Sequence, residues 1–325
     1  MTRVRFIPAQ GTGPRRRHPL HGNDRIWTQT NCYVDLWVEL LHLVGRDPVA
    51  GLGFTFSSDF DGTQWTFLKP PPEDLRALYG IEVAELNIWR PVRDHIAEQL
   101  GRRVLLTVEV DSFHLPDTAG DSYRATHGKT TIVPLAMDIG RRTLRYLHNA
   151  GTFSLSGDDF EAVLPPIGPG HGGYLAPYVE RIVLDGLAPT DGLATRAAAL
   201  AVEHLRRRPA TNPVQRMGER LLADVTTATG GDIDAFHRLM FGTCRQCGSA
   251  AELAADHAEW LDTHLGVGSA AAAPHFRDVA TGAKSLQFTM ARAMHGRAVD
   301  VSGTFERMAS SYDEGMRIVT ASLGG

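Results

Sequence analysis

Apolar residues recur at helical spacing near the beginning of the chain. From Cys32 onward, one face of a helix would carry Tyr33, Leu36, Trp37, Leu40, Leu41 and Val44, so that face is expected to be buried. Thr30 or Asn31 can cap the first turn, and Gly45 can adopt the left-handed conformation that commonly ends a helix. The pattern therefore predicts a helix whose first residue is Cys32.

Strand patterns follow in the same half of the chain. Residues 104–110 are dense in β-branched side chains and predict a strand in the centre of a sheet. Residues 129–136 and 143–147 predict two more strands, joined by a hairpin turn at 138–140. A shorter strand is expected over 64–69, and short helices over 73–78 and 91–100. This half is expected to fold as an α+β domain.

The second half has a different composition. Residues 165–173 contain three prolines and four glycines and are expected to form a linker. Beyond them, helical periodicity covers residues 193–207, 212–229, 233–241, 250–265, 271–294 and 302–323. We therefore predict an α+β domain over 1–164 and a helical bundle over 174–325.

Composition and charge narrow the possible functions. The net charge of −4 disfavours a nucleic-acid binder, because neutralising phosphates requires a basic face. No stretch approaches the roughly 18 apolar residues of a membrane span, and residues 1–10 lack the pattern of a cleaved signal. Three cysteines do not make a disulfide framework. We expect a cytoplasmic protein that binds neither nucleic acid nor membrane.

Three polar residues follow the order of a thiol catalytic triad. His127 opens the predicted strand 129–136, and Asn149 follows the strand 143–147. A helix packed on these strands would bring the imidazole and the amide beside Cys32. Free N–H groups and the helix dipole at that position favour a thiolate. The alternatives are a buried structural cysteine, a strand histidine and a turn asparagine, with His148 and His114 as other candidate bases.

A second group of cysteines has the spacing of a metal or redox motif. Cys244 and Cys247 are separated by two residues, but the chain has no second pair for zinc, and the motif lies between helical segments. We expect these two cysteines to pack in the core and predict no metal site.

Several strings in the chain resemble the bacterial domain-of-unknown-function family 1839. They include Leu20-His21-Gly22, residues 30–37, Glu109-Val110-Asp111-Ser112-Phe113, His148-Asn149-Ala150-Gly151 and Arg245-Gln246-Cys247-Gly248. This resemblance covers nearly the whole chain. Residues 20–160 are also similar, more distantly, to the papain-like acyltransferase domain of the butirosin type. The shared features are a cysteine at a helix start, a strand ending in Asp111 before a Leu-Pro loop, and a histidine that opens a strand.

The second resemblance implies thioester chemistry on a papain-like fold. Cys32 would take an acyl or aminoacyl group from the phosphopantetheine thioester of a carrier protein and pass it to an amine or hydroxyl acceptor. The protein itself would bind no cofactor. Cys32, His127 and Asn149 would be catalytic, and the residues expected to contact substrate are Trp27, Asn31, Asp111 and His148.

One position departs from the papain-like pattern. Papain-like peptidases place an oxyanion-hole glutamine about six residues before the cysteine, where this chain has Ile26. The departure disfavours a peptidase more than an acyltransferase, because a thiolate leaves without needing a proton. The alternatives are a thiol hydrolase (peptidase, amidase or thioesterase) and a non-catalytic binding protein. The helical half is expected to cover the catalytic domain, bind a carrier or acceptor, or form a homodimer.

Overall fold

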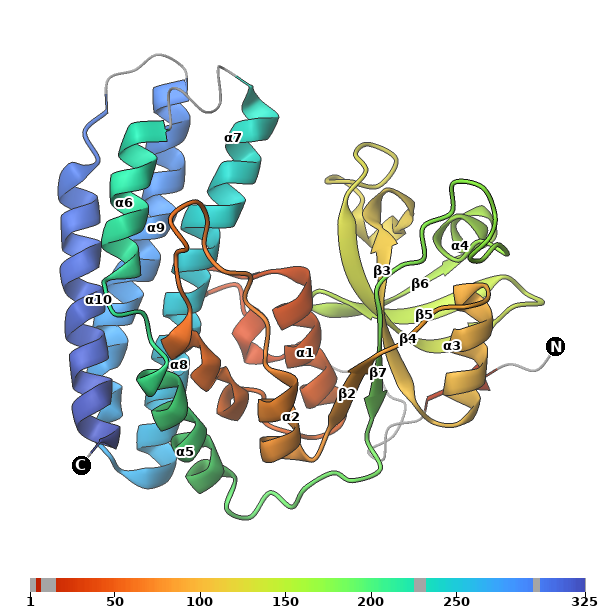
Figure 1. Ribbon diagram of the computed structural model, residues 1–325, viewed down its shortest axis with the longest axis horizontal. Helices are drawn as coiled ribbons and strands as arrows, with labels where there is room; N and C mark the ends of the chain where they lie inside the picture. The colour runs from red at the N-terminus through yellow and green to blue at the C-terminus, as the bar shows by residue number, and fades with distance from the viewer. Residues whose placement is uncertain (1–3, 7–15, 225–231, 295–298, 325) are drawn as a thin grey trace. The chain divides into compact units, whose positions relative to one another are not determined.

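An antiparallel sheet organises the first of two structural units in the computed structural model, which describes residues 4–6, 16–224, 232–294 and 299–324 (Figure 1). Within these residues the sheet has seven strands, and six of them follow the order β2-β7-β3-β4-β5-β6 while β1 pairs with β4. The strands are β1 (Val4–Arg5), β2 (Glu82–Glu85), β3 (Leu105–Asp111), β4 (Lys129–Asp138), β5 (Thr143–His148), β6 (Gly151–Ser156) and β7 (Val179–Val183).

Helices cover this sheet. The unit contains α1 (Cys32–Leu43), α2 (Pro72–Tyr79), α3 (Val92–Gly101) and α4 (Asp158–Val163), with short turns at Pro19–His21, Ser112–His114 and Pro116–Thr118. Helix α1 packs on β4 and β5, whereas α3 packs on β3 and β4, and the two helices lie on either side of the strands in Figure 1. Gly45, with φ of 72°, follows the end of α1, as its position predicted.

The second unit is helical. It contains a 3₁₀ segment (Val49–Ser57), α5 (Leu193–Arg206), α6 (Pro213–Asp224), α7 (Ile233–Met240), a π-helical turn (Phe241–Arg245), α8 (Gln246–Leu265), a short turn (Ser269–Ala272), α9 (Ala273–Met294) and α10 (Ser302–Leu323). Helix α9 packs against both α8 and α10. A side-chain carbon at Gly282 of α9 would come within 2.5 Å of Met308 of α10, so the glycine permits these two helices to pack closely.

The strongest sequence patterns are confirmed. The predicted strands at 104–110, 129–136 and 143–147 correspond to β3, β4 and β5, and the predicted helices at 73–78 and 91–100 correspond to α2 and α3. The predicted strand at 64–69 is wrong, because Trp65 forms only an isolated bridge with Phe60. Strands β2, β6 and β7 were not predicted, since they are short and β2 and β6 are largely exposed.

The boundary between the units lies later than the expected linker. Strand β7 pairs with β2 and β3, so the sheet unit comprises residues 1–21, 32–48 and 72–190. Residues 22–31 and 49–71 belong instead to the helical unit, together with 191–325. Residues 225–229 of the predicted helix 212–229, and most of residues 1–10, lie outside the described residues. Among the helices that are described, none is both long and apolar enough to span a membrane.

Candidate functional site

Cys32 is the first residue of α1 and is half-buried. Its Sγ atom lies 3.9 Å from the hydroxyl oxygen of Thr131 on β4, within the range of a weak sulfur hydrogen bond. Helix α1 packs on β4 and β5, and its residues 33–41 are all buried, so the prediction that only one face of the helix is buried is wrong. The sequence prediction that Cys32 begins a helix is confirmed.

The register of the strands shows which residues share the face of the sheet that Cys32 contacts. Thr131 pairs with Glu109, and Lys129 pairs with Asp111. Side chains directly opposite each other in an antiparallel pair point to the same face, as do alternate residues along one strand. Asp111 therefore shares the face of Thr131 and lies two residues, or roughly 7 Å, further along the strands.

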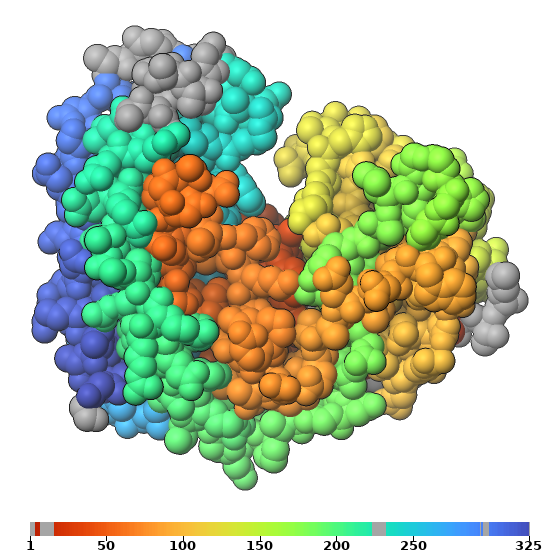
Figure 2. Space-filling model, viewed as in Figure 1, coloured from red at the N-terminus to blue at the C-terminus, as the bar shows by residue number. Residues whose placement is uncertain are grey.

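Asp111 holds the His127 ring at the end of this face. The His127 Nδ1 atom lies 2.6 Å from Asp111 Oδ2, and the ring stacks on Phe113 with 4.3 Å between centroids. The His127 side chain is 71% exposed. Among the described residues its Nε2 atom has no hydrogen-bond partner. The segment 112–126, which precedes His127 in the chain, reaches the surface and is yellow in Figure 2. An imidazole fixed through one nitrogen and open at the other is suited to proton transfer.

Asp111 is itself held as a carboxylate. Its Oδ1 atom accepts hydrogen bonds from the backbone N–H groups of Phe113, at 3.0 Å, and Gly128, at 3.1 Å. Burial opposes ionisation, but the hydrogen bond from His127 and the two backbone N–H groups outweigh it and lower the pKa of Asp111. The residue that orients His127 is therefore an aspartate on β3.

Asn149 occupies the turn between β5 and β6. Its φ of 45° is left-handed, a conformation that asparagine tolerates better than most residues. Within the described part of the chain, His127 is hydrogen-bonded to Asp111 and not to Asn149, and neither residue is hydrogen-bonded to Cys32. The structure thus places Cys32 and the His127–Asp111 pair on one face of the sheet and gives Asn149 the geometry of a turn residue.

His148 lies in a buried hydrogen-bond network. Its side chain is only 1% exposed, with Nδ1 at 2.6 Å from Asp117 Oδ2 and Nε2 at 2.7 Å from the Thr130 hydroxyl. The hydroxyl of Tyr146 also donates to Asp117. Thr130 and His148 face away from the side of the sheet that carries Thr131. Because both ring nitrogens are occupied, we assign His148 to packing and not to substrate contact.

Trp27 and Asn31 belong to the helical unit. Trp27 is 5% exposed, and its indole N–H donates to Ala280 O at 3.1 Å. Asn31 is 3% exposed, and its amide donates to Leu68 O and to the side-chain oxygen of Gln246. These contacts anchor the segment that precedes α1, and the substrate contacts expected of both residues stay predictions.

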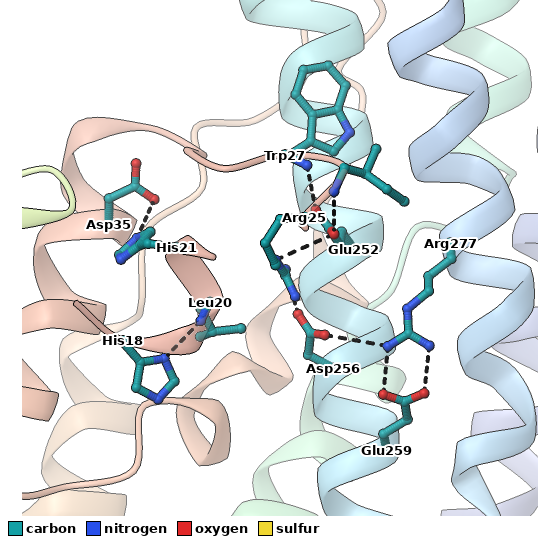
Figure 3. Close-up of polar contacts among 11 residues, drawn as sticks. His18, Leu20, His21, Arg25, Trp27, Asp35, Glu252, Asp256, Glu259 and Arg277 are labelled. Atoms are coloured by element: carbon teal, nitrogen blue, oxygen red, sulfur yellow. Dashed lines mark hydrogen bonds and ion pairs between the residues drawn. The ribbon is translucent and has the colours of Figure 1, made fainter. Parts of the chain in front are cut away.

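An ion-pair network anchors the same segment (Figure 3). The guanidinium of Arg25 lies 2.7 Å from Asp256 and 3.4 Å from Glu252. Glu252 also accepts the backbone N–H of Trp27 at 2.8 Å. Arg277 forms two 2.6 Å hydrogen bonds with Glu259. Arg25 and the backbone of Trp27 therefore join residues 22–31 to α8 within the helical unit.

The sheet face beneath α1 also holds a buried carboxylate that sequence reasoning missed. Glu180 on β7 is 2% exposed and accepts hydrogen bonds from Tyr33 at 2.5 Å, Thr107 at 3.0 Å and Tyr178 at 2.8 Å. Burial, and next the negative charge of Glu180, raise the pKa of Tyr33. The sequence does carry one indication of this polar face. In the otherwise apolar strand 105–111, the polar residues Thr107, Glu109 and Asp111 alternate and therefore point to the same side of the sheet.

Cys244 and Cys247 are buried in the helical unit at 0% and 1% exposure. Burial raises the pKa of the Cys244 thiol to about 12, so it is protonated near neutral pH and unreactive. Across the described residues, no group of three or more His, Cys, Asp or Glu side chains is placed to hold a metal ion.

Two family models match the chain. The model of the DUF1839 N-terminal domain matches residues 16–184, and the model of the DUF1839 C-terminal domain matches residues 190–321. The division between them falls after β7, close to the boundary of the sheet unit. No curated protein matches the chain.

Proposed function

The chain belongs to the DUF1839 family, and from the geometry of its sheet unit we propose that it is a cysteine-dependent acyltransferase of papain-like organisation. Its donor is the phosphopantetheine thioester of a carrier protein, and its acceptor is an amine or a hydroxyl group. One observation carries the proposal. The thiol of Cys32 begins a helix on the sheet face that also carries an exposed imidazole oriented by a carboxylate.

The first step makes an acyl-enzyme. The Cys32 proton passes to Nε2 of the neutral His127 ring, and the thiolate attacks the carbonyl carbon of the thioester. A new S–C bond forms as the bond from that carbon to the donor sulfur breaks. The departing thiolate then takes a proton from the imidazolium. The products are acyl-Cys32 and the free thiol of the donor.

The second step transfers the acyl group. An amine attacks the acyl carbon, and His127 accepts the proton that the amine loses. The S–C bond to Cys32 breaks, and the released thiolate recovers the proton from the imidazolium. Asp111 stabilises the imidazolium in both steps and fixes the ring so that Nε2 remains open. The backbone N–H groups at the start of α1 can stabilise the oxyanion on the attacked carbon.

Two features favour thioester exchange over peptide cleavage. His127 is well exposed, so an acyl donor can reach its ring from solvent. Position 26 holds isoleucine and supplies no side-chain donor to an oxyanion. Expulsion of a thiolate requires less assistance from the site than expulsion of an amine. Thioester exchange therefore suits this set of residues best.

Intact-protein mass spectrometry tests the proposal. The full-length protein is incubated with the glycyl thioester of N-acetylcysteamine, which mimics a loaded phosphopantetheine arm, and the variants Cys32→Ala and Cys247→Ala are treated in parallel. We expect the mass of one glycyl group on the wild type and on Cys247→Ala, and none on Cys32→Ala. An added amine should release the adduct as the amide.

The other outcomes identify the competing functions. If the adduct forms but is released at the same rate by water with or without amine, the protein is a thiol hydrolase. If no adduct forms on the wild type with this donor or with a loaded carrier protein, and its behaviour equals that of Cys32→Ala, the protein is a binding module and the proposal fails.

A further inference from the structure

We propose that the hydroxyl of Thr131 is a catalytic group of this site, which donates a hydrogen bond first to the Cys32 thiolate and then to the oxyanion that forms beside it. This inference rests on the proposed function and assigns a residue that the sequence analysis did not identify. Its starting point is the 3.9 Å contact between Thr131 Oγ1 and Cys32 Sγ.

The Thr131 hydroxyl differs from the hydroxyls of neighbouring strand threonines. Thr107 donates to the carboxylate of Glu180 at 3.0 Å, and Thr130 lies 2.7 Å from the ring nitrogen of His148. Thr131 is only 4% exposed. Among the described residues, Cys32 Sγ is its sole side-chain partner. Leaving a buried hydroxyl unpaired is unfavourable, and the Cys32 thiol, which donates to the Thr131 oxygen, is the side chain that pairs with it.

The contact can serve both protonation states of the thiol. While Cys32 is protonated, its S–H donates to the Thr131 oxygen. Once the proton has moved to His127, the Thr131 O–H rotates and donates to the negative sulfur. Thr131 neither gains nor loses a proton in this exchange. A hydroxyl rotor that meets no competing acceptor can reverse its direction at little cost.

The same hydroxyl can stabilise the next charge that forms. When the sulfur attacks, negative charge moves to the carbonyl oxygen of the substrate. The carbon that carries this oxygen is then bonded to Sγ, and Sγ lies next to Thr131. Oxyanion sites use side-chain hydroxyls as well as amides as donors. The usual glutamine position holds Ile26, so Thr131 supplies a side-chain donor that complements the backbone N–H groups at the start of α1.

Thr130 provides a matched control in the same strand. It is 6% exposed and therefore as buried as Thr131, but it points to the opposite face of the sheet, toward His148. Replacing either threonine by valine removes one buried hydroxyl and retains the branched shape. Both variants test packing, but only Thr131→Val removes a donor from the thiol.

The test is the rate of iodoacetamide alkylation of Cys32, followed by peptide mass spectrometry at pH 7 and at pH 9.5. The variants are Thr131→Val, Thr131→Ser and Thr130→Val, each checked for thermal unfolding. We expect Thr131→Val to alkylate about tenfold more slowly than wild type at pH 7 and within about twofold of it at pH 9.5, where thiolate no longer limits the rate. Thr131→Ser and Thr130→Val should both remain within about threefold of wild type at either pH.

A second readout uses the acyl donor. With the glycyl thioester of N-acetylcysteamine, the Thr131→Val variant should lose about 100-fold in kcat/KM for acylation, and Thr131→Ser should recover most of it. The inference is overturned if Thr131→Val matches wild type, or if Thr130→Val loses as much as Thr131→Val. Those results leave the proposed function standing. It fails separately if wild-type Cys32 alkylates no faster at pH 7 than free cysteine and accepts no acyl group.

Discussion

Two histidine–aspartate pairs of the same geometry lie on opposite faces of one sheet. In each pair the Nδ1 atom of the histidine is 2.6 Å from a carboxylate oxygen, His127 with Asp111 and His148 with Asp117. The difference is burial. The side chain of His127 is 71% exposed and that of His148 is 1% exposed.

The difference in burial determines whether the second ring nitrogen, Nε2, is accessible. Nε2 of His148 is occupied by the hydroxyl of Thr130, and the complete set of hydrogen bonds fixes a loop to the sheet. Nε2 of His127 is open among the described residues, so it can exchange a proton with a substrate or with a thiol. A hydroxyl, an imidazole and a carboxylate in series therefore do not by themselves identify a catalytic site. Such a series can be catalytic only where a substrate can reach its terminal group.

The largest effect should come from the exposed pair. We expect His127→Ala to lower the rate of Cys32 acylation by about 10²- to 10⁴-fold, because general acid–base assistance is lost. Its free energy of unfolding should change by less than about 0.5 kcal/mol, since the side chain is largely exposed. Stopped-flow acylation and urea denaturation measure the two quantities. A variant that acylates at the wild-type rate would remove His127 from the mechanism.

The buried pair should respond in the opposite way. His148→Ala removes one of the two side chains that donate to the buried carboxylate of Asp117 and leaves Tyr146 as the other, so we expect the free energy of unfolding to fall by about 1–3 kcal/mol. Acylation per folded molecule should stay within about threefold of wild type. Urea denaturation and active-site titration with the acyl donor measure these effects. If stability is unchanged while acylation is lost, the roles of the two histidines are reversed from those assigned here.

A third histidine, His21, extends the comparison because its contribution to stability depends on pH. The buried His21 ring lies 2.7 Å from Glu39 and 3.3 Å from Asp35; Figure 3 shows the contact with Asp35. Burial favours the neutral ring, but hydrogen bonds and charge from Asp35 and Glu39 outweigh it and raise the pKa of His21 to about 9. Since the folded value exceeds the unfolded one, the stabilisation is complete below about pH 6.5 and is lost as the pH rises through about 9.

The difference in unfolding free energy between wild type and His21→Gln should therefore shrink as the pH rises. We expect it to fall by about 3 kcal/mol between pH 6 and pH 10. Chemical denaturation at a series of pH values provides the measurement. A difference that is constant over this range would show that His21 is not held as a cation in the folded protein.

The elements that the sequence predicted well are those with local periodicity. The helix from Cys32 and the strands over 105–111, 129–138 and 143–148 each carry apolar patterns that are independent of distant partners. Strand β7 could not be found in this way, because pairing with β2 and β3 alone makes it part of the sheet. The same holds for residues 22–31, which contact α8 and α9 far along the chain.

The candidate site was predicted in part for the same reason. Cys32 and His127 were identified from their positions at the start of a helix and of a strand. The choice between Asp111 and Asn149 as the partner of His127 depends on the register of β3 and β4, which the sequence does not reveal. Thr131 was not identified, because one threonine in a strand has no distinguishing pattern until its neighbour is known to be a thiol.

The central claim is that Cys32 and His127 act as one pair, and cross-linking tests it most directly. A short reagent with two bromomethyl groups on a single carbonyl can alkylate a thiol and then a ring nitrogen within its reach. Peptide mapping of the treated full-length protein should find Cys32 joined to His127, and His148→Asn should give the same product. The claim is contradicted if Cys32 is alkylated but is linked to no histidine, or is linked to His114 instead of His127.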